Sequence, residues 1–218
     1  MIMQTSNAKI GWGLWLQWVL VSILGFGVGA AIGNAAANAI PPMTCTQSFS
    51  DNPIERLTNL PCIQPSLGLV VIVIILGLAG GFMQWLVLRR RIAGAGWWVP
   101  ATSLGFPIAL VIAEDAMRLV GDFTAAPILQ GVLFGVLSAI TPWLVLRRQI
   151  ARAGWWLPAH LLGSLVGGAL GIVSFHVVGL IGFYELVWAA AGAMFGAGLG
   201  AITGITLVWL LRQPVPGK

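Results

Sequence analysis

Six long runs of apolar residues constrain this chain more than any other feature of its sequence. They cover residues 12–33, 67–88, 97–120, 127–146, 155–180 and 186–211. A helix of about 20 apolar residues crosses the ~30 Å hydrocarbon core of a bilayer. Hydrophobic residues make up 58 % of the chain and charged residues only 8 %, whereas soluble domains carry roughly 25 % charged residues. The sequence therefore predicts an all-α, polytopic membrane helix bundle with six transmembrane helices.

Lysine and arginine are distributed unevenly between the two sides of this predicted bundle. Nine of the eleven fall on one side: Lys9, Arg89, Arg90, Arg91, Arg147, Arg148, Arg152, Arg212 and Lys218. Because cytoplasmic loops carry the excess of basic residues, both termini are predicted to be cytoplasmic and the loop 34–66 to lie outside. Topology thus explains the net charge of +5 without a nucleic-acid partner. We expect a multi-pass protein of a bacterial inner or photosynthetic membrane, in contact with the lipid bilayer.

Residues 1–39 allow an alternative interpretation as a cleaved signal peptide. Lys9 precedes an apolar run, and Ala37-Asn38-Ala39 resembles a cleavage site. The run is longer than the 7–15 residues of a usual signal-peptide core, and the repeat described next includes it. A structural span is the favoured interpretation.

An internal repeat divides the chain into three units. The segment QWLVLRRRIAGAGWWVPA (84–101) recurs as PWLVLRRQIARAGWWLPA (142–159) at an offset of 58 residues. The first span aligns with the third at an offset of 80 and the last aligns with the fourth at 65, so odd spans match odd spans and even spans match even ones. We predict three tandem two-helix hairpins within a single transmembrane domain (1–218): residues 1–91, which include the loop 34–66, 92–150 and 151–218.

The repeated QWLVLRR…AGWW unit resembles one found in uncharacterised bacterial multi-spanning membrane proteins, often from photosynthetic lineages. The resemblance covers about two thirds of the chain. It implies the hairpin-repeat fold and favours a photosynthetic membrane, and it implies no activity.

Small residues recur every four positions at equivalent places in the repeat. Gly25, Gly29 and Gly33 correspond to Gly163, Gly167 and Gly171, and the last span carries Gly192, Gly196, Gly200 and Gly204. Such spacing lays a flat stripe along one helix face and lets two backbones approach closely. We predict that these stripes face other helices of the bundle.

Ten of the eleven tryptophans lie near the predicted cytoplasmic ends of spans. Tryptophan is enriched at membrane–water interfaces. They are therefore interpreted as an interfacial belt.

Both cysteines of the chain, Cys45 and Cys62, lie in the predicted outer loop. An even number of cysteines in an extracytoplasmic segment favours a disulfide. A loop of this size would contribute about 3 kcal/mol in the chain-entropy model. Two free thiols are the alternative, and sulfur atoms far apart in the oxidised protein would establish it.

Two layers of polar residues recur in all three units. Ser22, Thr102 and His160 are equivalent near the inner side, and Asn38, Arg118 and His176 are equivalent near the outer side. The outer layer belongs to a candidate site for an ion, a proton or a polar headgroup, formed by Glu114, Asp115, Arg118, His176 and Glu185. The plainer alternative is that Glu114 and Arg118 pair at i, i+4 near the interface.

His160 and His176 are weak candidates for ligating a haem or a chlorophyll, because imidazole is a common axial ligand. They share one predicted helix on different faces, so they cannot hold one haem between them. Hydrogen-bonded structural histidines are the favoured alternative. No cofactor and no metal ion is expected.

The sequence contains no P-loop, GxSxG, HExxH, CxxC or dinucleotide-binding motif. The leading hypothesis is a non-catalytic membrane protein, a structural or accessory subunit of a larger complex with other membrane-protein subunits. The alternatives are a small transporter or channel with a polar site near the outer face, and a pigment- or haem-binding protein.

Overall fold

The computed structural model describes residues 11–40, 67–120, 126–150, 152–183 and 186–213. These residues form six long helices and no strand: α1 (Trp12–Asn38), α3 (Leu67–Leu88), α4 (Trp98–Val120), α5 (Ala126–Leu146), α6 (Trp156–Leu180) and α7 (Val187–Leu211). Short 3₁₀ turns, η1 (Ala95–Trp97) and η2 (Ala153–Trp155), precede α4 and α6. All six helices are long and apolar enough to cross a membrane. The predicted all-α fold with six spans is confirmed, and it fits an integral membrane protein.

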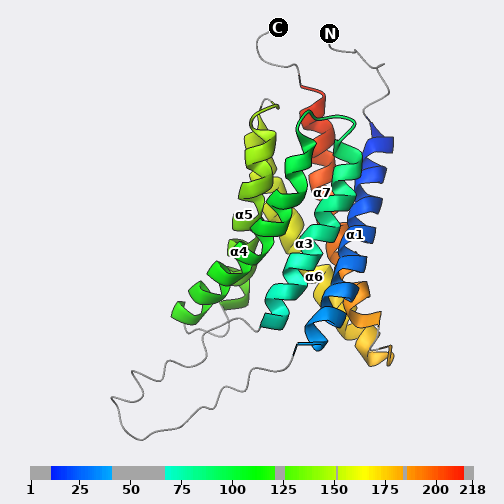
Figure 1. The fold of residues 1–218 in the computed structure, drawn as a ribbon, viewed down its shortest axis with the longest axis vertical. Coiled ribbons are helices and arrows are strands. Elements are labelled where there is room, and N and C mark those ends of the chain that lie inside the picture. Colours follow the sequence, from blue (N-terminus) through cyan, green and yellow to red (C-terminus); the bar gives the residue numbers. More distant parts are fainter. Residues whose placement is uncertain (1–10, 41–66, 121–125, 151, 184–185, 214–218) are drawn as a thin grey trace, which may run out of the picture.

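The helices form a closed ring. Each packs along the next one in the sequence, and α7 packs along α1, so the first and last helices are neighbours. In Figure 1, α1 begins, α7 ends and the turns after α3 and α5 lie at the same end of the bundle, drawn at the top. We call this the arginine end, because it carries Arg89, Arg90, Arg91, Arg147 and Arg148.

The glycine stripes lie at helix–helix interfaces, as predicted. A Cβ atom placed on Gly29 would lie 3.0 Å from Leu76 Cα of α3. One placed on Gly163 would lie 3.2 Å from Leu199 Cα of α7. The first stripe therefore packs on α3 and the last on α7, each against the following helix. Superposition of the three hairpins stays a prediction.

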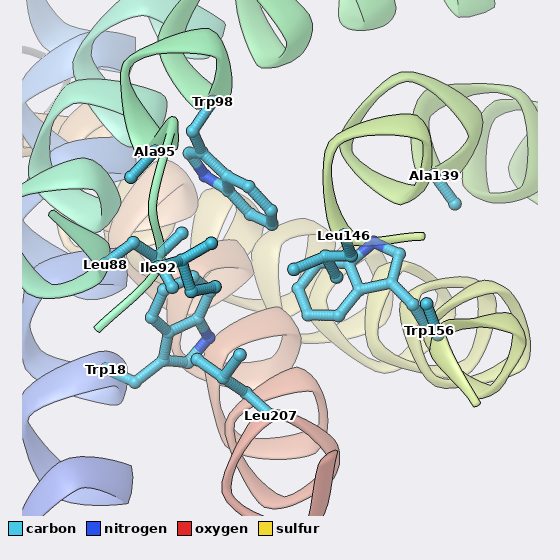
Figure 2. Packing of buried hydrophobic residues seen from close by; sticks show 10 residues of the cluster. Trp18, Leu88, Ile92, Ala95, Trp98, Ala139, Leu146, Trp156 and Leu207 are labelled. Carbon is cyan, nitrogen blue, oxygen red and sulfur yellow. The ribbon is translucent and has the colours of Figure 1, made fainter. Parts of the chain in front are cut away.

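Three tryptophans at equivalent repeat positions meet inside the ring at the arginine end (Figure 2). Trp18, Trp98 and Trp156 are at most 2 % exposed. Their ring centroids lie 5.3–6.3 Å apart, with interplanar angles of 73–82°. Such edge-to-face contacts suit aromatic rings, because the positive ring edge meets the negative face.

The prediction of an interfacial belt is wrong for these three tryptophans. In each Trp-Trp pair the first ring points outward and the second inward. Trp97 and Trp155 are 71 % and 61 % exposed, whereas Trp98 and Trp156 are buried. The pair spans the change from 3₁₀ turn to α-helix, and consecutive residues there face different sides. Only one ring of each pair can reach the interface.

A second aromatic layer lies farther from the arginine end. Phe26 and Phe106, again equivalent in the repeat, stack at 5.7 Å with an interplanar angle of 6°. Phe195 of α7 and Phe134 of α5 pack edge-on against this pair. These phenylalanine side chains thus occupy the centre of the bundle at this level, where a channel would need open space.

The two turns at the arginine end share one backbone conformation. Gly94 and Arg152, equivalent at an offset of 58 residues, both have positive φ, 70° and 59°. Glycine adopts this left-handed conformation freely, but a side chain is strained in it. Preceding each turn, an arginine covers the tryptophan four residues earlier: Arg89 lies 5.1 Å from the ring centre of Trp85, and Arg147 lies 5.0 Å from that of Trp143.

Candidate functional site

The inner polar layer lies inside the ring. Ser22, Thr102 and His160 are 0 %, 2 % and 3 % exposed, although they come from three helices far apart in the sequence. The repeat explains this convergence, because each residue follows its core tryptophan by four positions and so lies one helical turn farther along the same face. These residues and the tryptophans form the polar cluster discussed below.

Gln84 joins three helices at this cluster. Its Nε2 donates a hydrogen bond to Ser22 Oγ of α1 at 3.1 Å. Its Oε1 accepts one from Trp98 Nε1 of α4 at 3.0 Å. Gln84 is 4 % exposed, so both bonds are shielded from water. A buried polar group that loses its partner costs more free energy than an exposed one. The amide holds α1, α3 and α4 in register.

Thr203 plays a similar part between α1 and α7. Trp18 Nε1 donates to Thr203 Oγ1 at 3.0 Å, and that hydroxyl in turn donates to the Leu199 carbonyl at 2.6 Å. Thr102 also returns its hydroxyl to its own helix, donating to the Trp98 carbonyl at 2.5 Å. These hydroxyl protons are used within the bundle.

His160 connects α6 to α5. Its Nδ1 lies 3.2 Å from the Gly135 carbonyl oxygen and 3.3 Å from Ser164 Oγ. A carbonyl only accepts, so the geometry assigns the proton to Nδ1. In the neutral ring Nε2 is then an acceptor. The described residues supply no hydrogen bond to Nε2.

Trp156 differs from the other two core tryptophans. Its Nε1 is buried and has no hydrogen-bond partner among the described residues. A cavity of about 10 Å³ lies beside it, roughly the space of one water centre. The cavity is lined by Phe26, Gln84, Trp98, Thr102, Phe106, Pro142, Trp156, His160, Leu199 and Thr203. This space is too small for a tetrapyrrole, which argues against His160 as a haem or chlorophyll ligand.

The structure does not join the outer candidate residues that it describes. Glu114 is half-buried and Asp115 exposed on α4, and His176 is exposed on α6. The Nδ1 of His176 lies 2.8 Å from the Ile172 carbonyl of its own helix. No hydrogen bond or ion pair links these three side chains in the described part of the chain. His176 stays a weak ligand candidate.

Four residues of the predicted sites lie outside the described part of the chain. They are Cys45, Cys62, Glu185 and Arg118, of which only the side chain is not described. The outer polar site and the disulfide therefore stay predictions. Among the described residues, no group of three or more His, Cys, Asp or Glu side chains could hold a metal ion.

Sequence reasoning identified Ser22, Thr102 and His160 but missed their partners. Gln84 carries a detectable signal, since it is the single polar side chain in the run 67–88. The sequence gives a weaker signal for Thr203 and for the inward-facing tryptophans. Hydroxyls are common in membrane helices, and tryptophan positions near span ends equally suit the lipid interface.

Comparison with known proteins does not extend this picture. No protein-family model, no curated protein and no solved structure matches the chain.

Proposed function

We propose that this protein is a non-catalytic integral membrane protein, a structural or accessory subunit of a larger membrane complex. The observation that carries the proposal is how the polar groups in the ring are used. Gln84, Ser22 and Thr203 bond to neighbouring helices or to tryptophans, and His160 bonds to the Gly135 carbonyl. Groups that bind a transported substrate must instead face open space that admits it. This cluster leaves room for about one water.

The side of the ring formed by α5 and α6 supports an association with another subunit. In an apolar stretch of 18 residues, only 22 % of α5 and of α6 is buried, compared with 33–50 % in the other four helices. Beyond Gly171, every described side chain of α6 is exposed or half-buried. At Gly168, an added Cβ would meet nothing within 4 Å. A transmembrane helix of another subunit could approach α6 closely at that position, because helices in lipid associate by packing at small residues.

The resemblance of the QWLVLRR…AGWW unit to proteins of photosynthetic lineages supports placing this complex in a bacterial inner or photosynthetic membrane. The excess of basic residues at the arginine end supports cytoplasmic termini. Cysteine-accessibility labelling tests the orientation, and an outward-facing Arg147 turn would contradict it.

Site-directed photo-crosslinking tests the proposed association. A photoreactive residue at Ile172 of α6 should give one discrete crosslinked protein band, and gently solubilised membranes should show the chain in a larger complex on native electrophoresis. Ile32 of α1 is the matched control, because it lies within two residues of the equivalent repeat position and is similarly exposed, 54 % against 63 %. Crosslinks from Ile172 to lipid alone, together with a single-chain species on the native gel, would refute the proposal.

A further inference from the structure

Each core tryptophan points its indole N–H toward the second helix of a predicted hairpin, which is α3, α5 or α7. Trp98 donates to Gln84 on α3, and Trp18 donates to Thr203 on α7. In Figure 2 the nitrogen of Trp156 lies on the side of its ring that faces α5, near Ala139. The repeat thus brings three equivalent donors to three equivalent helices.

On α5, the positions that supply a partner elsewhere are occupied differently. Pro142 stands where α3 has Gln84, and Ser138 stands where α7 has Thr203. Proline offers no polar side-chain atom. Ser138 Oγ donates to the Phe134 carbonyl at 2.6 Å, and no described hydrogen bond joins it to Trp156. The third donor therefore has no hydrogen-bond partner among the described residues.

An acceptor without a described donor lies at the same place. His160, which lines the cavity with Trp156 and Pro142, has its Nε2 free of described partners. One donor, Trp156 Nε1, and one acceptor, His160 Nε2, therefore belong to residues that line a cavity of about 10 Å³, and a buried water needs about this volume and two to four polar partners.

We propose that a single water molecule is bound here, accepting a hydrogen bond from Trp156 Nε1 and donating one to His160 Nε2. A bare cation suits the site poorly, because the indole N–H directs its positive end into the cavity. The water would replace the missing glutamine and complete the third tryptophan contact. This inference is independent of the proposed function.

Solid-state NMR of the full chain in lipid, with tryptophan labelled by ¹⁵N at Nε1, tests the site. The Trp156 indole, assigned by its absence in W156F, should show a cross-peak with water. The Trp18 and Trp98 indoles, which bond to side chains, should show none. A folded protein whose Trp156 signal lacks the water cross-peak would overturn the proposal.

The variant P142Q provides the matched test, because it places on α5 the residue that α3 carries. The glutamine Oε1 should accept from Trp156 Nε1 and displace the water, so the cross-peak should be lost while the Trp18 and Trp98 signals keep their positions. Persistence of the cross-peak in folded P142Q would count against the site. If the signals of Trp18 and Trp98 show that P142Q is not folded, H160F replaces it. Removal of the acceptor should then abolish the cross-peak, and its persistence would overturn the proposal.

Discussion

The interface between α1 and α7 and the interface between α5 and α6 occupy equivalent places in the repeat but are packed very differently. α7 carries Gly192, Gly196, Gly200 and Gly204, and a Cβ on any of the four would press against α1. The equivalent residues of α5, at an offset of 65, are Pro127, Gly131, Gly135 and Ala139. A Cβ on Gly131 would reach only a methyl group of Leu165, at 3.4 Å.

The closeness of packing at these two interfaces therefore follows the number of small residues along α7 and α5. No hydrophobic force drives apolar helices together in lipid, so the contact area that glycine permits has to do so. The tryptophan hydrogen bonds differ in the same way: Trp18 donates to Thr203 across the α1–α7 interface, whereas no described side chain of α5 bonds to Trp156. Of the two interfaces compared, α1–α7 is the more closely packed and α5–α6 the less closely packed.

The largest effect should come from two adjacent residues of α6, one of which faces α7 while the other does not. A Cβ on Gly167 would lie 2.5 Å from the Phe195 carbonyl of α7, whereas one on Gly168 would meet nothing within 4 Å. Gly167→Leu should cost more than about 3 kcal/mol of unfolding free energy, because two backbones must separate. Gly168→Leu should stay within about 0.5 kcal/mol. Unfolding in mixed micelles by SDS titration measures both, and equal losses would show that α6 is covered on both faces.

A pair of alanine substitutions at equivalent positions tests the two interfaces directly. Gly196→Ala places a methyl group against the Ser22 carbonyl and should destabilise the protein by about 1–3 kcal/mol. Gly131→Ala should be neutral or stabilise by about 0.5 kcal/mol, since glycine weakens a helix. The same titration compares them. A loss at position 131 as large as that at 196 would mean that α5 and α6 approach as closely as α1 and α7.

Gln84→Leu should remove from Trp98 the kind of side-chain partner that Trp156 already lacks among the described residues. Trp98 Nε1 and Ser22 Oγ would both lose a partner in the core. The expected cost is about 1–2 kcal/mol, mainly from the buried indole donor. Gln84→Glu, which keeps the acceptor but adds charge, is a useful second variant and should be worse. Unchanged stability of Gln84→Leu would show that these bonds contribute nothing net.

The smallest effect is expected at the turn before α6. Arg152 adopts φ 59°, where the equivalent residue before α4 is Gly94. Arg152→Gly should stabilise the protein by about 0.5–1 kcal/mol through relief of strain. Gly94→Ala is the reciprocal change and should destabilise by a similar amount. If both changes destabilise, Arg152 makes a contact worth more than its strain.

The sequence predicts the six spans well, because span length and apolarity are set by the bilayer and leave little freedom. The predicted 67–88 coincides with α3, and 127–146 starts one residue inside α5. The glycine interfaces were also predictable, since a four-residue period defines one helix face. The position of each tryptophan near a span end says nothing of which way its ring points, so the core trio was missed.

The polar cluster could be predicted only in part. The repeat marks Ser22, Thr102 and His160 as one layer, because equivalent residues of repeated hairpins lie at one depth. It does not reveal their partners, which depart from the repeat: Gln84, Pro142 and Leu207 are equivalent yet chemically different. The outer layer differs again. His176 points away from the ring, as expected for a residue about 160° around the helix from His160.

The closed ring has a consequence for how the chain is made. Trp18 and Thr203, which bond across the α1–α7 interface, are 185 residues apart in the sequence. At ~5–20 residues per second, synthesis of that stretch takes roughly 10–40 s. Throughout this time the face of α1 that packs on α7 is uncovered and the Trp18 indole lacks its Thr203 partner. The tightest interface of the mature protein is thus the last to form during biogenesis, and any insertion factor that assists this protein has to shield α1 until α7 arrives.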